Sequence, residues 1–299
     1  MTEQAAISGQ TALVGVIGDP VRHSLSPAMQ NAALRAMGLD WVFLALPAPA
    51  ERFAAVVASL ETLGCRGLNV TIPHKQAACA LADELSPLAQ RVGAVNTLVR
   101  RSGGGWFGTN TDVEGFCAPL RENGPQRWRG QRALVLGCGG SARAVVAGLV
   151  ELGCGAIEVA GRDPVRLQAF IADCAAWAPR LQPLDWNSPG ALEASLAAAA
   201  LVVNTTPVGM RSADDPQAVE RCPLSPEQLD QLSAGSTVYD LIYTPRPTRL
   251  LQEAGARGCT AIDGLEMLVQ QGAAALRHWS GRQDVPVALM RQALLEQLP

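Results

Sequence analysis

Long apolar runs, a leader-like N-terminus and an excess of charge of one sign are all missing from this sequence of 299 residues. Its longest apolar stretches, such as SLAAAALVV at 195–203, are far too short to span a bilayer. The N-terminal MTEQAAISGQ lacks the basic-then-apolar layout of a signal peptide. The net charge of −3 gives no electrostatic reason to expect a nucleic acid or an anionic membrane as partner. We therefore expect a cytoplasmic protein that binds neither.

Metal-binding and disulfide patterns are missing as well. None of the eight cysteines forms a CxxC pair, and the only histidines are His23, His74 and His278. This spacing fits no metal site, so we expect no bound metal. Cys138 interrupts a glycine loop, and the other cysteines lie among alanine and leucine. We interpret all eight as small hydrophobic residues in a reducing compartment.

What the sequence does have is a large apolar fraction in an alternating pattern. Hydrophobic residues make up 48% of the chain and charged residues 17%, enough for a sizeable core and, at this length, for two domains. β-like and helix-like segments alternate, which predicts an α/β fold with parallel strands. The predicted strands are 12–18, 41–46, 66–72, 94–100, 132–137, 156–161, 201–206, 237–243 and 259–264, with a short return at 106–112. The predicted helices are 26–38, 51–64, 73–85, about 115–124, 141–153 and the segment from Leu265 onward.

The stretch GCGGSA at 137–142 follows a predicted strand and opens a predicted helix. This is the G-x-G-x-x-A form of the dinucleotide fingerprint. Gly137 permits the tight turn, Gly139 lets the backbone approach a pyrophosphate, and Ala142 allows close helix–strand packing. The anion would sit on the N-terminus of this helix, where free N–H groups point outward. The sequence therefore predicts a dinucleotide site here.

The next strand ends in Gly161-Arg162-Asp163, at the place where an NAD site usually carries an acidic residue. A guanidinium at Arg162 can pair with the 2′-phosphate of NADP, and Arg166 could add to it. Asp163 works against this because a carboxylate repels a phosphate. The pattern favours NADP and leaves NAD possible; Arg166 and Asp163 are equally consistent with solvated charges at a helix start.

Lys75 follows the apolar strand and Pro73, in the first turn of a predicted helix. A helix N-terminus disfavours a cation by about 0.3–1 kcal/mol. Most lysines at such positions are solvated surface residues. This one, however, emerges at the carboxyl end of a buried strand, where open α/β sheets bind ligands. The helix dipole would lower its pKa and make it a better proton acceptor. His74 is the competing base and should point to another side of the helix.

Other polar candidates precede predicted helices. Ser24 and Ser26 could bind a carboxylate, although serines there are most often helix caps, and we expect Ser26 to be one. Asp112 in TNTD could orient Lys75 and oppose the effect of the dipole, or it could serve as a turn or cap residue.

Eight motifs then occur in one order along nearly the whole chain, and in that order they resemble the shikimate dehydrogenase family. They are IGDPVRHSLSPAMQN (17–31), NVTIPHK (69–75), GAVNT (93–97), GTNTDVEG (108–115), GCGGSAR (137–143), NTTPVGM (204–210), YDLIYTPRPTRLL (239–251) and DGLEMLVQQGA (263–273). The resemblance implies two α/β domains, a substrate domain of residues 1–118 and 265–299 and a Rossmann-type NADP domain of residues 119–264. It also implies reversible, NADP-dependent reduction of 3-dehydroshikimate to shikimate, in the chorismate pathway of aromatic amino acid biosynthesis.

Carried over motif by motif, the resemblance implies a role for each site residue. Lys75 and Asp112 would be the acid–base pair. The substrate residues would be Ser24 and Ser26 at the carboxylate, Thr71, Asn96 and Gln271 at the ring hydroxyls, and Tyr243 at the carboxylate end. The cofactor residues would be Gly137, Gly139, Gly140, Ser141, Ala142, Arg162 and Thr206, with Met210 and Gly264 lining the nicotinamide pocket.

Two departures from the family pattern leave alternatives open. Gly161-Arg162-Asp163 replaces the usual Asn-Arg-Thr, and Thr205-Thr206-Pro207 replaces the usual Ala-Thr-Ser. The nearest alternative is a dehydrogenase of quinate, or of an amino analogue of shikimate, that prefers NAD. An alternative of another class is a nucleotide-binding regulator that has lost catalysis. We expect a monomer or a homodimer.

Overall fold

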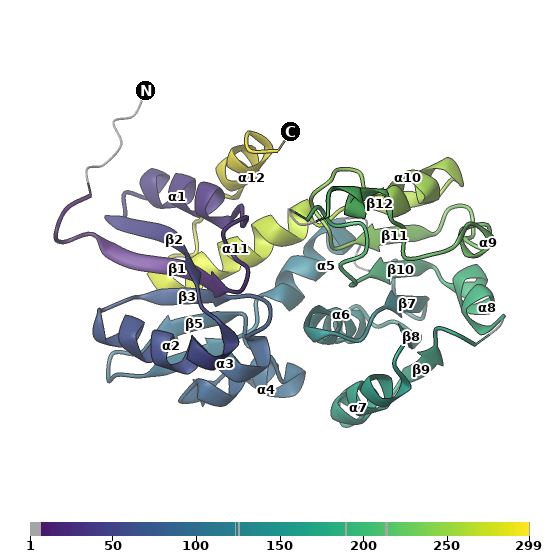
Figure 1. The fold of residues 1–299 in the computed structure, drawn as a ribbon, viewed down its shortest axis with the longest axis horizontal. Coiled ribbons are helices and arrows are strands. Elements are labelled where there is room, and N and C mark those ends of the chain that lie inside the picture. The colour runs from purple at the N-terminus through teal and green to yellow at the C-terminus, as the bar shows by residue number, and fades with distance from the viewer. Residues whose placement is uncertain (1–6, 123, 125, 189, 213–214, 299) are drawn as a thin grey trace. The chain divides into compact units, whose positions relative to one another are not determined.

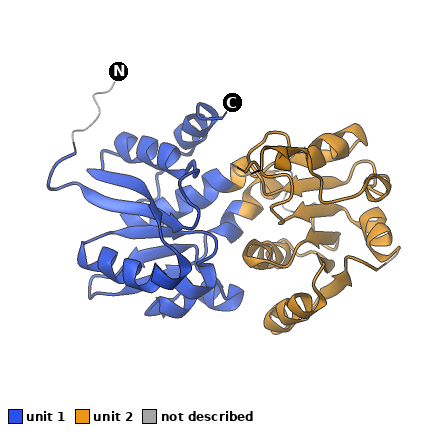
Figure 2. Ribbon diagram, in the orientation of Figure 1, with its two compact units in different colours: residues 1–115, 268–299 blue, residues 116–267 orange. Residues whose placement is uncertain are grey.

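The computed structural model describes residues 7–122, 124, 126–188, 190–212 and 215–298. The chain divides into two compact units, shown in Figure 2: unit 1 is residues 1–115 and 268–299, and unit 2 is residues 116–267. Each unit is built around its own six-stranded sheet (Figure 1). The predicted α/β class is confirmed.

The sheet of unit 1 mixes strand directions. Its order is β2-β1-β3-β5-β6-β4, in which β2, β1 and β3 run parallel and β5 runs antiparallel to both β3 and β6. The sequence predicted parallel strands with a short return at 106–112, and it did not predict that β5 is antiparallel to β3. The strands are β1 Ala12–Gly18, β2 Trp41–Pro47, β3 Gly67–Val70, β4 Glu84–Leu85, β5 Thr97–Arg100 and β6 Trp106–Thr109.

Helices cover both faces of this sheet. On one face, α2 packs Phe53 and Val57 against Leu68 of β3. On the other, α11 places Trp279 beside Phe43 of β2, with ring centroids 6.0 Å apart. Gly67 makes room for that tryptophan, since a Cβ there would lie 2.1 Å from its Nε1. The helices of unit 1 are α1 Ser26–Ala36, α2 Phe53–Thr62, α3 Lys75–Leu81, α4 Pro87–Val92, α12 Val287–Leu295, the first residues of α5 Asp112–Glu122 and most of α11 Leu265–Ser280, with the 3₁₀ turn Ala50–Arg52 before α2.

Unit 2 is a doubly wound parallel sheet of order β12-β11-β10-β7-β8-β9. Its strands are β7 Arg132–Leu136, β8 Ala156–Gly161, β9 Leu181–Asp185, β10 Leu201–Asn204, β11 Thr237–Asp240 and β12 Thr260–Ile262. Its other helices are α6 Gly140–Glu151, α7 Pro164–Cys174, α8 Ala191–Ala198, α9 Pro226–Leu229 and α10 Arg249–Ala256, with a 3₁₀ helix at Pro216–Glu220. The strand order reverses between β7 and β10, which is where such sheets bind their ligands.

The core of unit 2 lies on both faces of this sheet. On one face, Leu196 of α8 and Leu250 of α10 pack against Val202 and Val238. On the other, Phe116 of α5 stacks on Tyr239 of β11 at 5.3 Å. Alternate faces of each buried strand are therefore covered, as their unbroken apolar runs require.

Several predicted boundaries are wrong. The helix predicted at 73–85 is only α3, because residues 72–73 form a turn and the helix begins at Lys75. Residues 84–85 form the short strand β4 instead. The helix predicted at about 115–124 begins earlier, at Asp112. The helices α4, α7, α8, α9 and α10 and the strand β9 were not predicted from the sequence.

Candidate active site

The carboxyl ends of β1 and β3 meet at one edge of the unit 1 sheet. Thr71 N donates to Ile17 O at 3.0 Å, and Asp19 N donates to Ile72 O at 3.0 Å. The two chain segments that leave these strands are therefore fixed side by side. After the turn at Pro73, Lys75 is the first residue of α3, and its carbonyl accepts from Val95 N at 2.9 Å.

Lys75 and Asp112 form an ion pair at this edge. Lys75 Nζ donates to Asp112 Oδ2 at 2.6 Å, and the two side chains are only 14% and 8% exposed. The other carboxylate oxygen, Oδ1, accepts from Asn96 Nδ2 at 2.8 Å. Asp112 does not cap the helix that it begins; the side chain of Asn110 accepts from Asp112 N at 3.0 Å instead. The Asp112 carboxylate is thus directed at the lysine.

Asn96 is held in turn by two threonines. Its Oδ1 accepts from Thr111 N at 2.7 Å and from Thr97 Oγ1 at 3.0 Å. Its Nδ2 donates to Thr111 Oγ1 at 3.0 Å as well as to Asp112. Both amide protons of Asn96 are therefore engaged inside the protein, and the orientation of Asp112 is determined by a buried network.

Asn69 is a site residue that the sequence analysis missed. It lies on β3, is 5% exposed, and points its Nδ2 at Thr97 Oγ1, 3.3 Å away. Its Oδ1 is buried and has no hydrogen-bond partner among the described residues. An unpaired buried acceptor beside Asn96 suits a ligand that donates a hydrogen bond. The available signal was an asparagine within the otherwise apolar strand GLNV.

The two serines lie at the start of α1. Ser26 is the first residue of α1, and the cap position is Leu25, whose side chain makes no cap bond. The expectation that Ser26 is a cap is therefore wrong. Ser24 Oγ accepts from Ser26 N at 3.2 Å, which bends the chain before the helix. Pro27 is the second helical residue.

The remaining candidates of unit 1 lie on separate elements. Thr71 follows β3. Its side chain packs against Gly18, since a Cβ on that glycine would lie 2.4 Å from Thr71 Cγ2. Gln271 lies on α11, 8% exposed, and its Nε2 donates to Leu268 O at 2.8 Å. His74 is buried at 2% exposure, lies 2.7 Å from Ala48 O through Nε2 and stacks on Phe53. The ring of His74 is therefore packed inside unit 1, and it is not exposed to a substrate.

In unit 2 the glycine loop joins β7 to α6. Gly137 has φ +102°, and a Cβ there would lie 2.8 Å from Thr205 Oγ1, so only glycine fits. Gly139 occupies the N-cap position of α6, so no side chain bonds to the free N–H groups there. A Cβ on Gly139 or Gly140 would meet nothing within 4 Å. Ala142 is fully buried. Free N–H groups at an unobstructed helix start fit a dinucleotide pyrophosphate.

Two exposed arginines follow β8: Arg162 comes directly after the strand, and Arg166 lies in the first turn of α7. Asp163 between them caps α7: its Oδ1 accepts from Val165 N at 3.0 Å and Arg166 N at 3.1 Å. The carboxylate of Asp163, which would repel the 2′-phosphate of NADP, is thus directed at the helix start. The guanidinium of Arg162 is therefore left for a phosphate.

The remaining predicted residues of unit 2 are the cofactor candidates Thr206, Met210, Gly264 and Ser141 and the substrate candidate Tyr243. Thr206 Oγ1 donates to Asn204 Oδ1 at 2.7 Å, and Met210 is 41% exposed. Gly264 is needed for close approach of two backbones, since a Cβ would lie 2.0 Å from Leu241 O. Tyr243 follows β11, and burial raises the pKa of its phenol. Ser141 lies in the first turn of α6.

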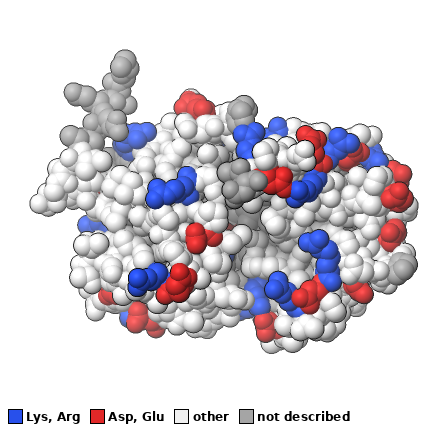
Figure 3. All heavy atoms as spheres, viewed as in Figure 1, with Lys and Arg blue, Asp and Glu red and all other residues white. Residues whose placement is uncertain are grey.

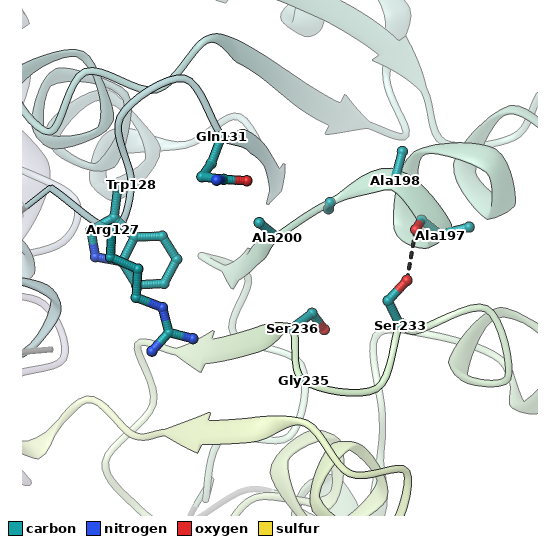
Figure 4. Close-up of a pocket in the computed structure, with 10 residues that line it drawn as sticks. Arg127, Trp128, Gln131, Ala197, Ala198, Ala200, Ser233, Gly235 and Ser236 are labelled. Carbon is teal, nitrogen blue, oxygen red and sulfur yellow. Dashed lines mark hydrogen bonds between the residues drawn. The ribbon is translucent and has the colours of Figure 1, made fainter. Parts of the chain in front are cut away.

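A separate hollow lies at the opposite, amino edge of the unit 2 sheet (Figure 4). It measures about 350 Å³ and is lined by residues that precede β7, β10 and β11. Its hydroxyls are already engaged, since Ser233 donates to Ala197 O at 2.7 Å. Arg127 stacks on Trp128 and donates to Thr237 Oγ1 at 3.2 Å. It contains none of the predicted site residues.

Within the described residues, no helix is long and apolar enough to cross a membrane, and no cluster of side chains could hold a metal ion. All eight cysteines lie in this part of the chain and are free. Burial raises the pKa of the Cys65 thiol to about 11 and that of Cys117 to about 12. On the face shown in Figure 3, acidic and basic side chains are interspersed over the surface of each unit.

Comparison with known proteins agrees with this geometry. The sequence model described as the shikimate dehydrogenase substrate binding domain matches residues 16–98, and that described as the shikimate 5'-dehydrogenase C-terminal domain matches residues 264–295. The chain is 50% identical over 294 residues to the shikimate dehydrogenase (NADP⁺) of Trichormus variabilis, covering 98% of this chain and 99% of that one. The chain belongs to the shikimate dehydrogenase family.

Solved structures of the family have the same fold. A shikimate dehydrogenase in complex with NADP⁺ superposes with a TM-score of 0.86 at 31% identity, covering 99% of each chain. The shikimate 5-dehydrogenase of Thermus thermophilus, in complex with NADP(H) and shikimate, gives 0.82 at 36% identity and covers 96% of this chain and 100% of that one. The family resemblance drawn from the eight motifs is confirmed.

Proposed function

We propose that this chain is an NADP-dependent shikimate dehydrogenase that interconverts 3-dehydroshikimate and shikimate. One observation carries the proposal: the 2.6 Å pair of Lys75 and Asp112, at the edge where the parallel strands of unit 1 end. Relatives about 50% identical over the whole chain are named for this activity and this cofactor.

Lys75 moves the proton in the proposed reaction. During reduction its ammonium donates a proton to the carbonyl oxygen of 3-dehydroshikimate; during oxidation its neutral amine takes the hydroxyl proton of shikimate. NADP, when bound, supplies or accepts the hydride. Asp112 Oδ2 fixes the direction of Nζ, and Asn96 fixes Asp112. Holding the proton carrier in place before the substrate arrives lowers the entropic part of the barrier.

The composition of the chain supports this role for Lys75. Of the 24 lysines and arginines, Lys75 is the only lysine. Arginine serves as an ion-pair partner or solvated cation, but its guanidinium stays protonated and cannot take up a proton. A chain that uses arginine everywhere else and lysine here is consistent with a need for a titratable amine.

The substrate residues remain as predicted. Ser24 and Ser26 are proposed to hold the carboxylate, with Tyr243 at the same end, and Thr71, Asn96 and Gln271 to hold ring hydroxyls. Asn69 joins them, because its buried Oδ1 has an unused acceptor position. Several groups that must pair with substrate hydroxyls give strong discrimination against analogues that lack them.

The cofactor residues follow the loop geometry of unit 2. The open start of α6, from Gly139 to Ala142, would hold the pyrophosphate, and Arg162 the 2′-phosphate. Thr206, Met210 and Gly264 are proposed to line the nicotinamide side. Residues 1–118 and 265–299 would form the substrate domain and residues 119–264 the cofactor domain. We place the enzyme in the cytosol, as a monomer or homodimer.

A four-way assay tests the proposal: kcat/KM for shikimate and for quinate, each with NADP⁺ and with NAD⁺. Shikimate with NADP⁺ is expected to be the best pair. If quinate with NAD⁺ is better by tenfold or more, the substrate and cofactor assignments are both wrong. If no pair reacts while NADP⁺ still binds, the chain is a nucleotide-binding regulator.

A further inference from the structure

A carboxylate lies completely buried at the carboxyl edge of the unit 2 sheet. Asp240 ends β11 and has 0% exposure. Its Oδ1 accepts from Asn204 Nδ2 at 3.0 Å and from Ile242 N at 3.2 Å. Its Oδ2 accepts from Thr248 Oγ1 at 2.7 Å. All three donors are neutral.

No cation among the described residues forms an ion pair with Asp240, although the charge of Asp263 acts on it. Asp263, after β12, pairs with Arg246 at 2.6 Å. On α10, Arg249 pairs with Glu253 at 2.5 Å. The nearby thiol of Cys222 has its own pKa raised, chiefly by burial and slightly by the charge of Asp240. The arginines near Asp240 are thus committed to other carboxylates.

Burial raises the pKa of Asp240 from 3.8 to about 6, opposed by the hydrogen bonds from Thr248, Ile242 and Asn204. The charge of Asp263 adds to the rise. At neutral pH Asp240 is therefore ionised, and its negative charge is buried without a positive partner. Burying an unpaired charge is costly, and carboxylates with strongly perturbed pKa values cluster at functional sites.

The position of Asp240 indicates which ligand could use the charge. In a doubly wound sheet a dinucleotide lies across the point where the strand order reverses, here between β7 and β10. The half of the dinucleotide that carries the 2′-phosphate, which would contact Arg162, lies over the end of β8. The nicotinamide half then lies over the ends of β10 and β11, whose last residues are Asn204 and Asp240.

Asn204 keeps this region fixed. Its Oδ1 accepts from Thr206 N at 3.0 Å and Thr206 Oγ1 at 2.7 Å, and Thr206 Oγ1 accepts from Val208 N at 3.3 Å. One continuous set of hydrogen bonds therefore joins the buried carboxylate to the loop that follows β10. The charge of Asp240 cannot move away when the cofactor binds.

We propose that Asp240 sets the preference of the site between the two redox forms of the cofactor, because its buried charge attracts the cationic oxidised nicotinamide and is indifferent to the neutral reduced one. The proposal rests on the nicotinamide-binding function proposed above. A unit charge at about 8 Å in a partly buried site changes affinity by about tenfold.

Asp240→Asn is the test variant, because the amide keeps the hydrogen bonds. Its oxygen can accept from Asn204 and Ile242, and its NH₂ can donate to Thr248 Oγ1. The matched control is Asp230→Asn, which removes the same charge from a carboxylate that is 65% exposed and paired with Arg257. The dissociation constants of NADP⁺ and NADPH are measured for both variants by isothermal titration calorimetry at pH 7.5.

We expect Asp240→Asn to weaken NADP⁺ about tenfold and NADPH less than twofold, and Asp230→Asn to change neither. Equal weakening of both forms would mean that Asp240 only shapes the loop, and no change would mean that it has no role; either result overturns the proposal. If the wild-type protein binds neither form, the proposed function itself is wrong.

A second measurement needs no folded variant. In the wild-type protein, the ratio of the NADPH to the NADP⁺ dissociation constant should fall about tenfold between pH 7.5 and 5, as Asp240 is protonated. The 2′-phosphate also titrates near pH 6, but it is common to both forms and cancels in the ratio. A ratio independent of pH would contradict the proposal.

Discussion

Lys75 Nζ lies 2.6 Å from Asp112 Oδ2, and each residue is the first of its helix, α3 and α5. A helix start favours the carboxylate of Asp112 and disfavours the ammonium of Lys75. In this pair, the helix start stabilises the carboxylate of Asp112, whereas it destabilises the ammonium of Lys75. Among the described residues, the hydrogen-bond and ion-pair partner of Nζ is Asp112, so the carboxylate determines where Nζ points.

The pair should be important for stability. Asp112→Ala leaves the nearly buried ammonium of Lys75 without a partner, and we expect a loss of about 3 kcal/mol in the free energy of unfolding. Urea-induced unfolding measures it. The control is Arg121→Ala, which breaks the exposed Arg121–Glu151 pair and should lose less than about 1 kcal/mol. A similar loss in both variants would show that the Lys75–Asp112 pair behaves as a surface ion pair.

Because Lys75 is the only lysine, amine chemistry can address it almost alone. Acylation with acetic anhydride should modify the N-terminus and Lys75, and activity should fall in proportion to Lys75 acetylation, followed by peptide mass spectrometry. Bound shikimate should protect Lys75 from acetylation and should preserve the activity. A protein fully acetylated at Lys75 that keeps its turnover would exclude the lysine from catalysis.

Cofactor choice should depend on Arg162. Its guanidinium is exposed, and the neighbouring carboxylate is engaged in capping α7. Arg162→Ala should raise the KM for NADP⁺ at least tenfold, since a charge-assisted bidentate contact is lost, and leave the KM for NAD⁺ nearly unchanged. Arg180→Ala is a suitable control, because that side chain bonds to Cys154 O on another part of the unit. Equal effects on both cofactors would mean that Arg162 does not contact the 2′-phosphate.

The buried charge of Asp240 should affect how the free energy of unfolding depends on pH. Its pKa is raised in the folded state, so its contribution to stability is complete below the unfolded value of 3.8 and is lost as the pH rises through about 6. Asp240→Asn does not titrate. Relative to wild type, the variant should therefore gain up to about 3 kcal/mol in unfolding free energy between pH 4 and 7.5. A difference that does not change with pH would mean that folding leaves the pKa of Asp240 at its unfolded value.

Some of the fold and site could be predicted from local sequence. The glycine loop of unit 2 was placed correctly because GCGGSA is short, contiguous and constrained by backbone conformation. Lys75 became a candidate because its strand and helix are adjacent. The family motifs added roles to residues such as Ser24 and Gln271, which no periodicity distinguishes.

Other features depend on long-range contacts that local sequence does not encode. Asp112 reaches Lys75 across 37 residues, through strands whose pairing is antiparallel. The cap at Ser26 was predicted from residue type, and the turn at Ser24 displaced it. Asn69 and Asp240 lie inside apolar strands, where polar residues go unnoticed until their partners, or the lack of them, can be seen.

The central claim is that Lys75 transfers the proton, and Lys75→Gln tests it most directly. The amide can still donate to Asp112, but it cannot take up a proton. We predict that kcat for shikimate oxidation falls by about 10²–10⁴-fold while the dissociation constant for shikimate changes only a few-fold. A variant that binds shikimate and retains near-normal kcat would contradict the account.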